Sequence, residues 1–261
     1  MRAVASGVLE TAFTTFLLLI AVQWFDFGST AKATIAAAGA LGFMLGPVVV
    51  SRVADLGWTT AQAASRLALG AAACFALLAA VSNRWLFIGG IIMATTLGTA
   101  AIPMVTQIYQ ENYPAKRRGK YFSRTAMIRI ISAASFGLLV GWILTNDDDS
   151  QKLSGYPWGL MLIFALAFAW ASFCFSRLPG KTLTGAKGTH PFRSLRFVKE
   201  DKLFRHILIC WMLFGIGNLM LFPLRVEYLA NASEYADVYT LGFDPTPARI
   251  ALILVFIPNA V

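Results

Sequence analysis

The chain has 261 residues, of which 57% are hydrophobic and 13% are charged, and its mean hydropathy is +0.65. A soluble domain carries roughly 25% charged residues, and here the apolar residues lie in blocks long enough to cross a bilayer, which excludes an ordinary soluble domain. The net charge of +9 comes mostly from Lys and Arg in two loops, so it does not indicate a nucleic-acid partner.

Seven apolar blocks have the length of membrane-spanning helices, which need about 20 predominantly apolar residues. An eighth apolar run begins at Ile250 and ends with the chain at Val261. We therefore predict an all-α membrane protein with seven transmembrane helices and a truncated eighth. The seven blocks cover 6–25, 32–51, 65–83, 85–110, 121–145, 156–177 and 203–224.

The segment between the sixth and seventh blocks is rich in Pro, Gly and basic residues and is expected to be a linker. Its end, Phe192–Lys202, mixes apolar with basic residues in a pattern typical of an amphipathic interfacial helix. We expect three parts: a six-helix transmembrane half over 1–178, a cytoplasmic linker over 179–202, and the start of a second transmembrane half over 203–261.

The charges of the loops predict the orientation. Cytoplasmic loops of membrane proteins carry an excess of Lys and Arg. The loops after the second, fourth and sixth blocks are basic, and the loops between them are neutral or acidic. We therefore expect a cytoplasmic N-terminus, in a monomer that resides in the lipid bilayer of the cell inner (plasma) membrane.

The loop after the fourth block contains a recognisable motif. It reads Glu111-Asn-Tyr-Pro114-Ala-Lys-Arg-Arg118-Gly119, which is E-x-x-P-x-x-x-R-G. With six helices, a long connector and further helices, the chain resembles the major facilitator superfamily (MFS) of secondary transporters. The resemblance implies an MFS-type helical bundle, in which each six-helix half consists of inverted three-helix repeats.

The resemblance also implies a role for two loops in gating. The loop after the second block keeps Asp55 of the family's other loop motif, at a spacing one residue short and without the basic pair that follows it. We expect the cytoplasmic gating residues to be Asp55, Glu111, Pro114, Arg118 and Gly119.

Two charged residues lie inside predicted spans, where charge is costly and by default marks a function or a buried partner. Arg129 is either an anion-binding or gating residue, or a structural partner of Glu10 or Glu111 that reaches towards the cytoplasm. Glu10 is either a proton-coupling carboxylate or an acid at a helix start that the helix dipole stabilises.

Polar residues in the first, fourth and seventh blocks complete the candidate site. The fourth block places Thr95, Thr99 and Thr106 along one helical face, although threonine hydroxyls also bond to the preceding turn. In the family these three spans line the cavity. The substrate-cavity candidates are Glu10, Thr14, Thr95, Thr99, Thr106, Arg129, Asn218 and Arg225; Asn218 is equally suited to bridging helices.

The function that follows is secondary transport of a small solute by alternating access, with coupling to H+ or another ion left open. The sequence has no nucleotide-binding loop, catalytic triad or metal-ligand spacing. We therefore expect no enzyme activity, no cofactor and no metal. The alternative is a membrane receptor, an assembly partner or a truncated remnant that resembles these transporters without transporting.

Overall fold

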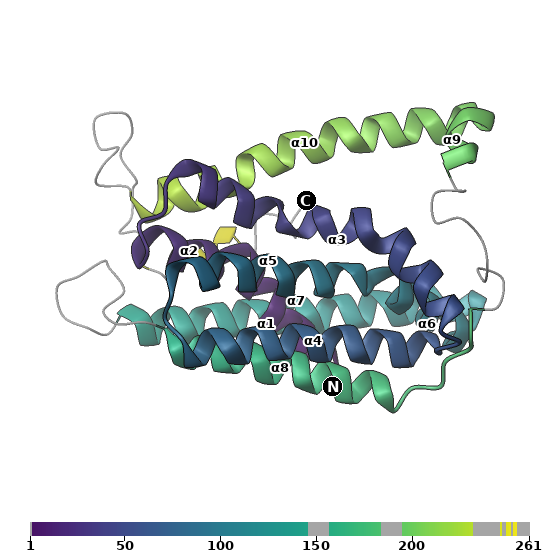
Figure 1. Ribbon diagram of the computed structural model, residues 1–261, viewed down its shortest axis with the longest axis horizontal. Coiled ribbons are helices and arrows are strands. Elements are labelled where there is room, and N and C mark those ends of the chain that lie inside the picture. Colours follow the sequence, from purple (N-terminus) through teal and green to yellow (C-terminus); the bar gives the residue numbers. More distant parts are fainter. Residues whose placement is uncertain are drawn as a thin grey trace.

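The computed structural model describes residues 2–145, 157–183, 195–231, 246, 249–251, 253 and 254. Within these residues the regular elements are helices, and one isolated bridge joins Thr59 to Thr182. Seven helical segments are long and apolar enough to cross a membrane, which confirms the all-α class and the seven expected spans (Figure 1).

The spans are numbered here in chain order, and two of them contain an irregular turn. Span one combines α1, the π-helix η1 and α2, and span four combines α5 and α6. The bounds are α1 Arg2–Thr11, η1 Ala12–Phe16, α2 Leu17–Gln23, α3 Ser29–Asp55, α4 Thr60–Ala80, α5 Arg84–Ala100, α6 Ile102–Asn112, the 3₁₀ turn η2 Ala115–Arg117, α7 Arg118–Thr145, α8 Trp158–Ser176, α9 Leu195–Glu200 and α10 Lys202–Ala230.

Side chains that cap free backbone N–H groups define where three of the helices begin. Thr59 and Gln62 form a reciprocal capping box at the start of α4. The Asn83 side chain accepts from two backbone N–H groups at the start of α5, and Asp201 accepts from Phe204 N at the start of α10. Each cap accepts hydrogen bonds from backbone N–H groups that a helix start leaves without a partner. The three capping residues therefore determine the residue at which each helix begins.

Span one lies in the middle of the bundle. The whole run Leu17–Val22 is buried, and Ala12 and Phe16 before it are fully buried. Its neighbours include α7, α8 and α10, so it is enclosed on several sides (Figure 1). The part Leu17–Val22 is apolar all round, as expected of a buried helix, and span one is therefore the axis around which the others pack.

The first six spans pack in three pairs: α1 with α7, α3 with α5, and α4 with α8. Small residues bring the first two pairs close together. A Cβ on Gly7 would lie 2.8 Å from the backbone N of Ala133 in α7, and one on Gly42 of α3 would collide with Thr96 and Thr99 of α5. Glycine at such contacts lets helix backbones approach, and dispersion then holds them together in lipid.

Hydrogen bonds join the same pairs. Thr11 of α1 donates its hydroxyl to Ala133 O of α7 at 2.9 Å, and Thr96 of α5 donates to Ala38 O of α3 at 3.4 Å. The third pair is reciprocal: Ser65 Oγ of α4 donates to Ser172 O at 3.0 Å, and Ser172 Oγ of α8 donates to Ser65 O at 2.8 Å.

Replacing either serine of the reciprocal pair is expected to weaken the α4–α8 contact modestly. S65A and S172A each remove one hydroxyl donor, and such bonds in membrane bundles contribute about 0.6 kcal/mol on average. We expect each variant to lower the free energy of unfolding by roughly this amount, measured by unfolding in detergent. The control S176A removes an exposed serine that bonds only to Phe173 O of its own helix and should leave stability unchanged.

Span seven, α10, joins the bundle through one end only. The loops that contain 56–59, 113–117 and 177–183 form what we call the basic end of the bundle, and α10 begins at Lys202 on the same side of the molecule (Figure 1). Among its described side chains, Val226 is the first that is buried, followed by Ala230. Both residues lie near the opposite end of the bundle. At that end α10 packs against α2 and α3 (Figure 1).

The linker and the eighth apolar run are described only in part. Within the expected amphipathic helix 192–202, α9 is helical, while 192–194 fall outside the described residues. Ile250, Ala251 and Leu254 are helical and buried, and a Cβ on Gly137 of α7 would lie 3.2 Å from the Ala251 Cβ. The expected truncation at Val261 also falls outside the described residues.

Candidate functional site

Glu10 of α1 and Arg129 of α7 form an ion pair inside the bundle, with Arg129 Nε 3.1 Å from Glu10 Oε2. Glu10 lies roughly 12 Å along span one and Arg129 roughly 17 Å along α7, at 1.5 Å per residue. Of the alternatives open for Arg129, the structure selects Glu10 as its partner rather than Glu111. The pair therefore places both charges at a similar depth in the membrane-spanning part.

The close contact of α1 with α7 creates this pair. The absence of a side chain on Gly7 lets α1 approach the backbone of α7 at Arg129 and Ala133. One turn further along α1, the Thr11 hydroxyl donates to Ala133 O. Glu10 thus lies between two direct contacts with α7, which fix its carboxylate opposite the guanidinium.

A π-helix, η1, begins two residues after Glu10. π-helical turns are rare and often occur at functional sites. Thr14 donates its hydroxyl to Glu10 O at 2.8 Å, so a side chain satisfies a carbonyl next to the irregular turn. Thr14 therefore stabilises the interruption of span one, and its hydroxyl is engaged with the backbone.

Span four contains an irregular turn as well. Ala101 separates α5 from α6, yet Ala101 N donates to Leu97 O and Val105 N donates to Ala101 O, so the helix continues through this point. Pro103 has no N–H to add to the ladder and kinks the span there. The structure thus places a π-turn in span one and a proline kink in span four.

The threonines of span four lie in different surroundings. Thr99 donates to Thr95 O at 2.9 Å and packs against Gly42 of α3. Thr95 is buried, and its Oγ1 has no hydrogen-bond partner among the described residues. Thr106 is exposed and donates to Ile102 O. The structure therefore brings Thr95 and Thr99 together against α3, and Thr106 lies beyond the kink.

The candidates of span seven lie apart from this site. Asn218 is exposed and Arg225 is half-buried, and both belong to α10. Neither has a hydrogen-bond partner among the described residues. They share an element with Glu227, which pairs with Lys32 at the start of α3. The structure therefore assembles Glu10, Thr14 and Arg129 into one site and leaves the α10 residues outside it.

Glu111 joins three segments at the basic end. Its carboxylate accepts from Lys181 N after α8 at 3.0 Å, from Thr60 Oγ1 at the start of α4 at 3.4 Å, and from Gln107 Nε2 at 3.2 Å. Thr60 N donates in turn to Lys181 O at 3.1 Å. The first residue of the E-x-x-P-x-x-x-R-G motif thus attaches the segment after α8 to the start of α4 and to α6.

The remaining motif residues shape the same loop. Arg118 donates to Gln110 O at 3.1 Å and Tyr113 O at 3.3 Å, so it caps carbonyls at the end of α6. Pro114 precedes the turn η2, and Gly119 lies in the first turn of α7 with open space around it. Asp55 is exposed at the end of α3, near the left-handed Gly57.

Removing the Glu111 carboxylate is expected to release residues 179–183 from the bundle. In E111A, Lys181 N and Thr60 Oγ1 lose their acceptor, a loss of roughly 1 kcal/mol. Cleavage through local opening follows the population of the open form. Tryptic cleavage after Lys181 should therefore become roughly fivefold faster. E200A, which removes an exposed carboxylate paired only with Arg196 of its own helix, should cleave there at the unchanged rate.

Three features of the structure were not expected from the sequence. Arg2 donates to the Tyr109 hydroxyl and lies 5.1 Å from the ring centres of Tyr109 and Phe175. The others are the Lys32–Glu227 pair and the π-helix. Lys32 and Glu227 have opposite charges and lie at the ends of the second and seventh blocks that are expected on the same side of the membrane, so the sequence contained a signal for this pair. No sequence pattern specifies the π-turn.

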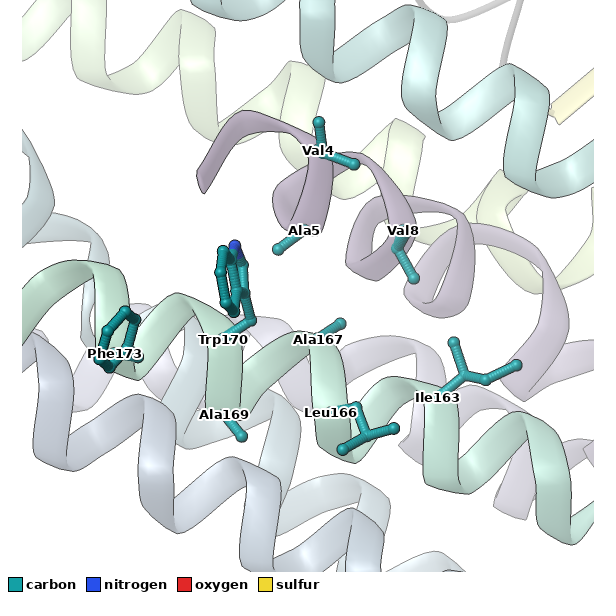
Figure 2. Close-up of a pocket in the computed structure, with 9 residues that line it drawn as sticks. All are labelled: Val4, Ala5, Val8, Ile163, Leu166, Ala167, Ala169, Trp170 and Phe173. Atoms are coloured by element: carbon teal, nitrogen blue, oxygen red, sulfur yellow. The ribbon is translucent and has the colours of Figure 1, made fainter. Parts of the chain in front are cut away.

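An open apolar groove runs between α1 and α8 (Figure 2). Val4 and Val8 of α1 border one side, and Leu166, Trp170 and Phe173 of α8 border the other. Its lining carries almost no polar surface, as expected where two spans meet lipid. The indole nitrogen of Trp170 is the polar side-chain atom among the lining residues, and neither Glu10 nor Arg129 lines the groove, so it is separate from the candidate site.

Among the described residues, no cluster of His, Cys, Asp or Glu has the composition of a metal site. The candidate site is therefore a charge pair beside an interrupted helix. No family model, no curated protein and no solved structure matches this chain.

Proposed function

We propose that the protein is a secondary transporter of the MFS type, which moves a small solute across the membrane by alternating access. The observation that carries the proposal is the irregular turn in each of spans one and four, a π-turn in the first and a proline kink in the second. Such transporters bind solute at discontinuous helices in corresponding positions of their repeats, because irregular backbone at membrane depth is tolerated where it lines a cavity or is buried in protein.

The packing of the six spans supports inverted repeats. In inverted repeats, a two-fold axis relates span one to span four, span two to span five and span three to span six. Under this relation the pair α1–α7 corresponds to the pair α5–α3. The pair α4–α8 corresponds to itself. The bonds follow the same relation, since Thr11 to Ala133 corresponds to Thr96 to Ala38. The reciprocal Ser65 and Ser172 bonds are what a pair on the axis would make.

The two ends of the bundle support the proposed motion. The basic end corresponds to the cytoplasm by the loop charges, and α10 joins the first six spans at the opposite end through the Lys32–Glu227 pair and buried Val226. This is the arrangement of a carrier closed on the outer side. The Glu111 network on the cytoplasmic side supports a role for the motif in holding the first half together during the change.

Uptake by proteoliposomes tests the proposal. The full chain is reconstituted and offered a panel of labelled organic acids, amines, sugars and amino acids, with an inward proton or sodium gradient and with none. We expect uptake of one class above that of empty liposomes, and accelerated exchange when the same unlabelled solute is inside. Saturable binding of a solute without uptake under any gradient would contradict transport and favour a receptor.

A further inference from the structure

The Glu10–Arg129 pair leaves most of the binding capacity of the guanidinium unused. Arg129 Nε is buried against Glu10 Oε2, yet neither atom makes a hydrogen bond of good geometry. The Arg129 side chain is still 43% exposed, and its Nη donors have no partner among the described residues. Arginine presents a planar fork that matches a carboxylate or similar oxyanion with two parallel bonds.

No other described charge near the pair compensates Arg129. On α1 the other charged residue is Arg2, which contacts Tyr109. On α7 the remaining charges, Arg118, Lys120 and Arg124, lie nearer the basic end. The helix η1 and α8 carry no charged residue, and the described start of the eighth run adds only Arg249, which is exposed. The site therefore holds one cation and one anion.

We propose that Arg129 binds the anionic group of a small solute through its Nη donors and that Glu10, at Nε, balances the charge of Arg129 when the solute is absent. This rests on the proposed transport function and adds a solute class, small monoanions with a carboxylate-like group. Two anions beside one cation would leave an uncompensated charge at membrane depth, which is costly. Solute binding is therefore linked to the transfer of one proton from water to the Glu10 carboxylate, which then becomes a neutral acid.

The direction of the pH effect follows from this exchange. A protonated Glu10 no longer neutralises Arg129 and no longer repels a second anion, so the affinity for the anion rises as the pH falls. When the anion leaves, Glu10 gives its proton back to water and pairs with Arg129 again. Proton and anion thus bind and leave together, with no net change in the charge of the site.

Methanesulfonate is a suitable probe because it stays anionic at every pH used, and methanesulfonamide is its neutral counterpart. The measured quantity is the shift in thermal unfolding of the detergent-solubilised full chain at mildly acidic and mildly alkaline pH, since a ligand that binds only the folded state stabilises it. We expect methanesulfonate to stabilise the wild type more at acidic pH, and methanesulfonamide to have no effect at either pH.

The variants separate the two roles. E10Q should bind methanesulfonate with the same affinity at both pH values, roughly five- to tenfold tighter than the wild type at alkaline pH. R129Q should lose binding. The double variant E10Q/R129Q guards against misfolding, because a neutral pair avoids the cost of one unpaired buried charge, and it should also fail to bind. R124Q, which removes an exposed charge from the same helix, should bind like the wild type.

Binding retained by E10Q/R129Q, binding of the wild type that does not depend on pH, or no binding by E10Q would each overturn the proposal. Transport is judged separately by proteoliposome uptake. Methanesulfonate binding that depends on Arg129, without uptake of any solute, would reject the transport function and retain the anion site. Uptake that R129Q leaves intact would reject the anion site and retain transport.

Discussion

Alanine at Gly7 or Gly42 is expected to destabilise the bundle strongly. The new Cβ at Gly7 would collide with the Arg129 carbonyl and lie 2.8 Å from Ala133 N. At Gly42 it would collide with the carbonyl of Thr96 and the side chain of Thr99. Backbone atoms cannot rotate away, so the paired helices must separate.

The expected loss in the free energy of unfolding is roughly 2 kcal/mol or more for each variant, as for overpacking in a well-filled core. It exceeds the gain in helix propensity of about 1 kcal/mol from glycine to alanine. Thermal unfolding in detergent, followed by size-exclusion chromatography, measures the loss. G89A is the matched control on α5, because no atom lies within 4 Å of its new Cβ. If G89A and G42A shifted unfolding equally, close packing at Gly42 would be rejected as the cause.

Linking Lys32 to Glu227 covalently is expected to stop transport almost completely. These residues join α3 to α10 at the end opposite the basic end, where alternating access requires the two halves to separate. The variant K32C/E227C, made after replacement of Cys74, Cys174 and Cys210, is treated with a short thiol-specific cross-linker that a reductant cleaves. Uptake should fall to the level of empty liposomes and return after reduction.

The control is a cross-link inside the first half. Ser65 and Ser172 lie in contact between α4 and α8, with 2.9 Å between their Oγ atoms. Oxidised S65C/S172C joins two helices that are expected to move as one body, so uptake should persist. Equal inhibition by both cross-links would indicate that any restraint stops the protein, and it would remove the support for two moving halves.

The sequence predicted the spans well because each depends on local composition. All seven apolar blocks are helical, and the basic loops meet at one end. The cap Thr59 starts α4 several residues before the predicted 65, whereas the cap Asn83 starts α5 within one residue of the predicted 85. Span one also begins earlier than predicted, at Arg2, because its first turns are polar in composition yet pack against α7.

The sequence named several residues of the candidate site, but it did not predict which of them contact one another. Glu10 was one of two partners considered for Arg129, and only the approach of α1 to α7 at Gly7 distinguishes it from Glu111. The threonine stripe of span four assumed a straight helix, whereas span four is kinked near Pro103, with Thr95 and Thr99 against α3 and Thr106 exposed. Such choices depend on contacts between distant helices, which periodicity within one helix does not contain.

The network of Glu111 has a further consequence for how tightly the two halves associate. Because Lys181 and Thr182 are bound to the start of α4, the tether between the halves runs only from Thr182 to Leu195 and spans at most roughly 45 Å when extended. A tether of this length keeps the effective concentration of one half near the other in about the millimolar range. At that concentration the Lys32–Glu227 pair and the buried side chains of Val226, Ala230, Ile250, Ala251 and Leu254 act together to favour the closed contact. Under the proposed function, this contact must open in every transport cycle.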